Sequence, residues 1–194
     1  MKAKEIQEKF ISSINRNDFE EYRKYLHLGA MVNEPDNQNC MITPLLLAID
    51  NNCNSIVKDL LENGANANLP QSNGTTPLMM AAQRDNLENV KLLIQYGAEI
   101  NAVNEDDMQG ALVIAENWDV IRFLVQSGAD LEIRDDWGQT PLAIAARIGD
   151  EKKAEILLEL GANPFAKDND GQIPLEIAKK HKNKYVIELL KMQN

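Results

Sequence analysis

Few residues of this 194-residue chain are of the types that support catalysis or bind a metal. It has two histidines, His27 and His181, and two cysteines, Cys40 and Cys53. The cysteines lack the paired CxxC spacing of a zinc site, and two cysteines do not make the disulfide ladder of a small secreted protein. We therefore expect reduced thiols, no metal site and no cofactor.

Carboxylates are more frequent, and three groups of them could hold calcium or act as a general acid and base. The groups are Glu105-Asp106-Asp107, Asp135-Asp136, and Asp168 with Asp170 before Gly171. The last group fails the EF-hand pattern, because Gly171 at its sixth place puts Ala166 and Ile177 at the first and twelfth ligand positions. The other two groups fall at predicted turn tips, where solvated carboxylates keep ordinary pKa values. We expect a charged surface at these sites rather than an enzyme active site.

Glycine and lysine patterns are the remaining candidates for anion chemistry. The glycines occur singly at wide spacing, which does not match a phosphate-binding loop. Four lysines cluster near the C-terminus and could bind an anion, although such a run more often forms a solvated helix face. The four are Lys179, Lys180, Lys182 and Lys184.

The charge balance argues against nucleic acid and membrane partners. The chain has 20 basic and 30 acidic residues, so its net charge is -10. That charge repels a phosphate backbone and an anionic bilayer. The N-terminal lysines are followed by no apolar segment, and no uncharged run approaches the ~20 residues of a membrane span. We expect a cytoplasmic protein, while export by another bacterial secretion signal stays open.

The stretch from Asn73 to Asn101 shows which elements must position these side chains. Thr76 is of a type that caps a helix N-terminus, and Pro77 follows at the first helical position, where its missing N–H costs nothing. Apolar residues then recur at helical spacing in two short segments. Gly97 ends the unit, because glycine readily adopts the left-handed conformation that closes a helix. The stretch predicts two short helices that cannot bury their apolar faces alone.

The same landmarks recur along the chain. Gly-Ala pairs begin at Gly29, Gly64, Gly97, Gly128 and Gly161, at intervals of 35, 33, 31 and 33 residues. The helix-opening triplet recurs in phase as Thr43-Pro44-Leu45, Thr76-Pro77-Leu78 and Thr140-Pro141-Leu142, and in altered form as Ile173-Pro174-Leu175. A period near 33 with this motif resembles the ankyrin repeat over the whole chain. The resemblance implies an all-α solenoid of stacked helix-turn-helix units with β-turn or hairpin tips.

We interpret the chain as a single ankyrin-repeat domain, 1–194, and predict six repeats. Their approximate bounds are 1–37 as an N-terminal cap, 38–71, 72–104, 105–134, 135–167, and 168–194 as a C-terminal cap. Polar residues on the outer faces of the end repeats favour this interpretation, because nothing packs beyond an end repeat.

The fourth repeat departs from the pattern. Met108 stands where the turn glycine belongs, and Gly110-Ala111-Leu112 replaces Thr-Pro-Leu, so the first helix loses its cap and its proline. Only 13 residues separate Ala115 from Gly128, against 16 between the equivalent positions of the third repeat. We expect Trp118, at the shortened corner, to fill the core. The family's usual histidine after Thr-Pro-Leu is also absent throughout, and we expect a less rigid centre.

The resemblance also implies a binding surface. In this family the turn tips and the exposed side of each first helix form a concave strip that usually binds protein partners. By position, the strip includes Asp50, Gln83, Arg84, Asp106, Asp107, Asn117, Asp136, Trp137, Gln139 and Arg147, together with Asn169, Lys180 and His181. Trp137 is the most informative of these, because aromatic anchors are enriched at interface hot spots. Its alternative role is to pack across a neighbouring turn.

We therefore predict a non-catalytic, monomeric protein-binding module that uses a concave, acidic face. The acidic residues would steer a protein partner with a basic patch. A narrower alternative is an inhibitor or immunity-type protein that blocks a basic enzyme or toxin. An enzyme is disfavoured by the missing catalytic constellation, and a small-ligand binder by the missing pocket motif.

Overall fold

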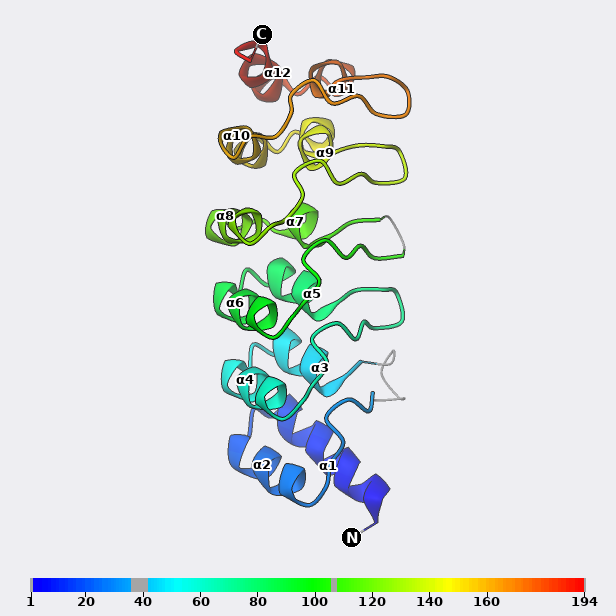
Figure 1. The fold of residues 1–194 in the computed structure, drawn as a ribbon, viewed down its shortest axis with the longest axis vertical. Helices are drawn as coiled ribbons and strands as arrows, with labels where there is room; N and C mark the ends of the chain where they lie inside the picture. Colours follow the sequence, from blue (N-terminus) through cyan, green and yellow to red (C-terminus); the bar gives the residue numbers. More distant parts are fainter. Residues whose placement is uncertain (1, 36–41, 106–107, 194) are drawn as a thin grey trace.

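The chain folds as a stack of helix pairs with loops projecting from one side (Figure 1). The computed structural model describes residues 2–35, 42–105 and 108–193, and these residues form twelve α-helices. The helices are α1 (Ala3–Asn15), α2 (Phe19–His27), α3 (Pro44–Asp50), α4 (Asn54–Glu62), α5 (Pro77–Gln83), α6 (Leu87–Gln95), α7 (Ala111–Ile114), α8 (Trp118–Gln126), α9 (Pro141–Ile148), α10 (Glu151–Glu159), α11 (Pro174–His181) and α12 (Lys184–Lys191). The first helix of each pair lies beside the loops, and the second lies on the far side of the stack (Figure 1). The predicted all-α solenoid is confirmed.

The predicted start and stop signals act as expected. The hydroxyl of Thr76 accepts a hydrogen bond from the backbone N–H of Met79 at 3.3 Å, and Pro77 begins α5. Thr43 and Thr140 cap α3 and α9 in the same way. Gly97 follows α6 with a φ of +83°, in the left-handed region. Local residue types therefore set these helix ends.

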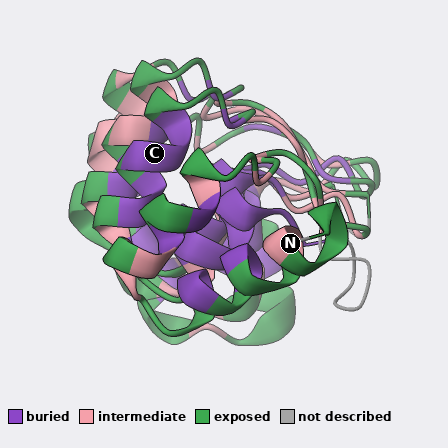
Figure 2. Cartoon of the chain, turned by 90° about the horizontal axis from the view of Figure 1, so that it is seen from below, coloured by how far each residue is buried: buried purple, intermediate pink, exposed green. Residues whose placement is uncertain are grey.

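The core is largely aliphatic, with Phe10, Tyr22 and Tyr25 buried in the first repeat, and it runs through the stack between the two helix layers, as the view along the stack shows (Figure 2). In the regular repeats a leucine follows the helix-opening proline, and Leu45, Leu78 and Leu142 are almost fully buried. Each pair buries these side chains against the neighbouring pairs. Stability therefore depends on stacking, as expected for a repeat array.

Asparagine side chains tie successive repeats together at the loops that follow the second helices. Asn33, Asn68 and Asn101 each donate from Nδ2 to a glycine carbonyl of the next repeat. Each also accepts a backbone N–H two residues after that glycine. This ladder was not predicted from the sequence. It links the repeats without the histidine network that the family usually has.

The fourth repeat is shorter, but the predicted short connection between its helices is wrong: residues 115–117 join α7 to α8 just as residues 84–86 join α5 to α6, and the missing residues come from α7 itself. Helix α7 has four residues, against seven in α5 and eight in α9, and Gly110 provides no side-chain cap. The prediction that Trp118 fills the core is wrong. Trp118 is the first residue of α8 and is 40% exposed, because Val120 and Ile121 of the same helix occupy the buried positions.

Candidate functional site

Seven of the predicted strip residues line one cavity of about 270 Å³ in the last two repeats. They are Asp136, Trp137, Gln139, Arg147, Asn169, Lys180 and His181. The other two lining residues are Asp168 and Asp170. We call this site the Trp137 cavity. It lies between the turns at 135–139 and 168–172 and the C-terminal ends of α9 and α11.

The backbone that carries Trp137 is held from two sides. Within the turn, Oδ1 of Asp135 accepts the backbone N–H groups of Trp137 at 3.0 Å and Gln139 at 2.7 Å. From the next repeat, the backbone N–H of Asn169 donates to the Trp137 carbonyl, and its side-chain amide donates to the Asp136 carbonyl, both at 3.0 Å. The indole itself points outward and is 59% exposed. A fixed backbone therefore presents an exposed aromatic side chain.

Asp135 does not behave as the sequence suggested. We expected a solvated carboxylate at a turn tip, but Asp135 is buried. Burial raises the pKa of Asp135, and the N–H groups of Gln139 and Trp137 together with the Arg147 charge oppose that rise. The expectation failed because this carboxylate turns inward to close the tip. Its neighbour Asp136 is exposed.

Arg147 is positioned by two residues of the same turn. Its Nε donates to Oε1 of Gln139 at 3.0 Å, and its guanidinium carbon lies 6.0 Å from the centroid of the Trp137 ring. Gln139 is 9% exposed, so it anchors Arg147 and offers little surface of its own. The guanidinium is thus held between a hydrogen bond and an aromatic face.

The Trp137 cavity carries both signs of charge. Its carboxylates belong to the two turns, at Asp136, Asp168 and Asp170. The basic side chains come from the ends of α9 and α11: Arg147, Lys180 and His181. The helix side of this part of the strip is therefore basic, while the turn side is acidic.

The remaining predicted residues do not join this cavity. Arg84 and Asp50 form an ion pair between the second and third repeats, with Nε of Arg84 3.1 Å from Oδ1 of Asp50. Gln83 is exposed next to Arg84. The side chain of Asn117 caps α8 by accepting the N–H groups of two residues of that helix. Asp106 and Asp107 lie outside the described residues.

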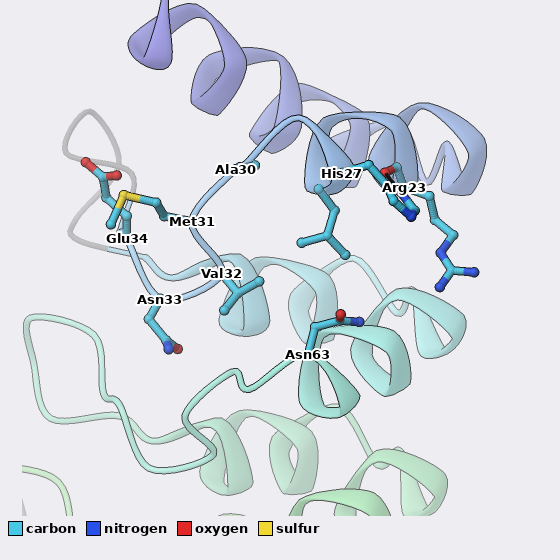
Figure 3. Close-up of a pocket in the computed structure, with 9 residues that line it drawn as sticks. Arg23, His27, Ala30, Met31, Val32, Asn33, Glu34 and Asn63 are labelled. Atoms are coloured by element: carbon cyan, nitrogen blue, oxygen red, sulfur yellow. Dashed lines mark hydrogen bonds between the residues drawn. The ribbon is translucent and has the colours of Figure 1, made fainter.

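A larger cavity of about 710 Å³ lies at the junction of α2, α4 and residues 30–34 (Figure 3). No predicted strip residue lines it. Its Arg23 pairs with Oδ1 of buried Asp59 at 3.0 Å, and Asn63 donates to the backbone carbonyl of Asp59. Arg23 is thus committed to the contact between the first two repeats and Asn63 to the end of α4, and size alone does not make this cavity the better candidate.

Among residues 2–35, 42–105 and 108–193, no group of three or more His, Cys, Asp or Glu side chains is placed to hold a metal ion. Within the same described ranges, every helix is too short or too polar to span a bilayer.

A family model described as ankyrin repeats (3 copies) matches residues 11–104 and 111–194. An ankyrin repeat protein of fowlpox virus is 31% identical over 145 residues, covering 74% of this chain and 19% of its own length. The probable 26S proteasome regulatory subunit p28 of Saccharomyces cerevisiae is 31% identical over 153 residues, covering 75% of this chain and 66% of its own. The chain thus spans less than two thirds of these relatives.

Two solved structures share the fold at low sequence identity. One chain comes from the structure of a Bdellovibrio bacteriovorus predatory endopeptidase in complex with an immunity protein. It has a TM-score of 0.84 and 23% identity, and the match covers 96% of this chain and 98% of that one. The ankyrin repeat domain of Bcl-3, a member of the IkappaB family, has a TM-score of 0.86 and 22% identity, covering 96% of this chain and 86% of its own.

Proposed function

Because the chain belongs to the ankyrin-repeat family, we propose that it is a non-catalytic protein-binding module whose partner docks at the Trp137 cavity. The observation that carries the proposal is the exposed indole of Trp137 on a backbone held by Asp135 and Asn169. Exposed aromatic side chains of this kind anchor many interfaces. Since the backbone is already ordered, little conformational freedom is lost when a partner docks.

The partner we propose is a protein with a basic patch. The carboxylates of Asp136 and Asp170 are exposed on the turn side of the cavity, and the chain as a whole carries a net charge of -10. Such a field accelerates the encounter with a basic surface and makes association sensitive to salt.

A narrower form of this function is inhibition, in which the chain covers the active site of a basic enzyme or toxin. The observation that favours it is the shared fold with a chain from the endopeptidase and immunity protein structure. A preordered face suits a blocking protein, because tight inhibitors change shape little on binding. We propose no catalytic role for Asp135, since it is buried and is not one of the residues that line the Trp137 cavity.

The test is affinity capture from a lysate of the source organism with the wild-type chain and Trp137→Ala. A hot-spot tryptophan contributes ~2 kcal/mol or more, so we expect W137A to weaken capture of the specific partner roughly 30-fold. Trp118→Ala is the matched control, because Trp118 is also partly exposed but lies away from the cavity. Equal capture by the wild type and W137A would remove the Trp137 cavity as the docking site.

A further inference from the structure

Arg147 differs from the other arginines of the chain in how its terminal nitrogens are used. The chain has six arginines, and all six lie in the described residues. Five of them direct a terminal nitrogen to a partner oxygen: Arg16 to Glu21, Arg23 to Asp59, Arg84 to Asp50, Arg122 to Glu159, and Arg134 to the carbonyls of Gly138 and Lys167. Arg147 is bonded through Nε alone, and within the described part of the chain its two terminal nitrogens have no hydrogen-bond or ion-pair partner.

These terminal nitrogens belong to a guanidinium that is already oriented. Gln139 holds Nε, the Trp137 ring lies against the group, and both residues are fixed by Asp135 through their backbone N–H groups. Arg147 lines the Trp137 cavity with its remaining donors unused. A planar guanidinium with two unused terminal nitrogens matches the two oxygens of a carboxylate.

From this geometry, and resting on the proposed docking of a protein at the Trp137 cavity, we propose that Arg147 receives a carboxylate of the partner. Lys180 lines the same side of the cavity and adds to its attraction for an anion. The partner surface therefore places an acidic group beside its basic patch.

A singly charged carboxylate fits this cavity better than a phosphate group. The carboxylates of Asp136, Asp168 and Asp170 line its opposite side. Their repulsion grows with the charge of the incoming anion, and a phosphate monoester carries about twice the charge of a carboxylate near neutral pH. The same aspartates would stabilise a positively charged partner group next to the bound carboxylate. A partner segment with neighbouring acidic and basic side chains therefore fits both the basic helix side and the acidic turn side of the cavity.

The two tryptophans provide the test. Each gives one indole N–H signal in a nitrogen–proton correlation spectrum, and the Trp137 signal is assigned with Trp137→Phe. The probe is the blocked tripeptide acetyl-Ala-Glu-Ala-amide, and the glutamine analogue of the same size is its neutral control. We expect the glutamate peptide to shift the Trp137 signal saturably while the Trp118 signal stays in place. A third peptide, acetyl-tri-alanine with a free terminal carboxylate, distinguishes a chain terminus from an acidic side chain, and binding of either one supports the carboxylate site.

Variants test whether the shift of the Trp137 signal depends on Arg147. We expect Arg147→Lys, which keeps the charge and loses the paired donors, to weaken binding of the glutamate peptide about tenfold. Gln139→Leu should weaken it about threefold or more by releasing the guanidinium from its anchor. Arg84→Ala is the control, because Arg84 is already paired with Asp50.

Three results would overturn the inference: equal shifts with the glutamate and glutamine peptides, a glutamate-dependent shift that persists in Arg147→Ala, or tighter binding of inorganic phosphate than of acetate at equal ionic strength. If the peptides fail while W137A still loses the captured partner, the carboxylate site is wrong and the proposed function stands. If the peptides bind as expected and W137A captures the partner normally, the docking site is wrong instead.

Discussion

The side-chain ammonium of Lys153 in α10 donates a hydrogen bond to the carbonyl oxygen of Val113 in α7 of the preceding repeat. The last carbonyls of a helix lack donors from a following turn, and α7 has only four residues, so Val113 is one of these acceptors. In the two neighbouring pairs the third residue of the second helix is the buried, apolar Val120 or Val186. Lys153 therefore supplies a donor where the shortened helix leaves an acceptor.

This lysine makes stability depend on pH. Burial lowers the pKa of Lys153 below its ordinary value of 10.5, although Asp150, Glu116 and Asp85 act to raise it. A lowered pKa means that folding disfavours the charged form, and this penalty is lost as pH rises through the folded pKa toward 10.5. We expect the free energy of unfolding of the wild type, relative to Lys153→Met, to increase as pH rises toward 10.5.

Urea unfolding at several pH values measures this difference. Lys152→Met is the matched control. Lys152 is the exposed neighbour of Lys153 in α10, and its substitution by methionine removes the same charge. The prediction fails when the Lys153→Met difference is constant with pH, or when Lys152→Met shows the same trend.

For Gly110→Ala, the backbone conformation alone predicts a gain in stability, whereas the surrounding structure predicts a loss. Its φ is -102°, which any residue can adopt, so replacing glycine by alanine should stabilise the chain by about 0.4–1 kcal/mol if space allowed. A Cβ at this position would lie 2.9 Å from the carbonyl oxygen of Ala102. We expect Gly110→Ala to destabilise the chain by ~1–3 kcal/mol, as overpacking does. Thermal or urea unfolding decides the sign, and an increase in stability would contradict the close contact.

The shortened fourth repeat should be the most easily opened part of the array. Helix α7 has a single turn and no side-chain cap, whereas α5 has a capping threonine and a proline at its start. We expect the amides of Ala111–Ile114 to exchange about tenfold faster than the hydrogen-bonded amides of Pro77–Gln83. Native-state hydrogen exchange by NMR measures both helices in one sample. Equal protection would show that Lys153 and Asn101 compensate fully for the missing turn.

The buried hydroxyl of Tyr22 joins the first two repeats. It donates to Oδ2 of Asp59 at 3.0 Å, and Asp59 is itself buried. Removing one partner of a buried hydrogen bond costs about 1–3 kcal/mol, so we expect Tyr22→Phe to reduce the free energy of unfolding by that amount. Tyr25→Phe is the control and should change it by about 0.5 kcal/mol or less, because its hydroxyl makes a long 3.5 Å contact with Glu21. A smaller loss for Tyr22→Phe than for Tyr25→Phe would contradict the role of Asp59.

The raised pKa of Tyr22 also makes folding stability decrease at alkaline pH. Burial raises the pKa of Tyr22 above its ordinary value of 10.0, and the neighbouring Asp59 raises it further. The unfolded chain therefore loses this proton first, and stability falls as pH rises above 10.0. We expect the wild type to lose stability more steeply than Tyr22→Phe from pH 10 to about pH 11. Urea unfolding measures the free energy of unfolding of both proteins at each pH. If that free energy changes with pH in parallel for the wild type and Tyr22→Phe, the prediction is wrong.

Part of the candidate site could be predicted by position, and part could not. The repeat phase placed Trp137, Arg147 and Lys180 on one strip, and these residues do line one cavity. The repeat pattern says which face a residue occupies, but it does not say whether a side chain is already engaged within the fold. Asn117 was predicted to bind a partner, yet its side chain caps α8. The repeat bounds, the partner class and the role of Trp137 stay predictions.

The sequence by itself determined where helices begin and end, because a capping threonine, a proline and a left-handed glycine act through bonds within a few residues, as Thr76 and Gly97 do. It also determined the stack, since a helix pair with two apolar faces needs neighbours on both sides. Tertiary structure alone decided that Asp135 is buried, that Lys153 reaches Val113 and that the terminal nitrogens of Arg147 are unused. Those outcomes depend on how the backbone of a turn is arranged and on which segments, a repeat or more apart in the sequence, pack against each other. Residue types and their spacing do not specify either.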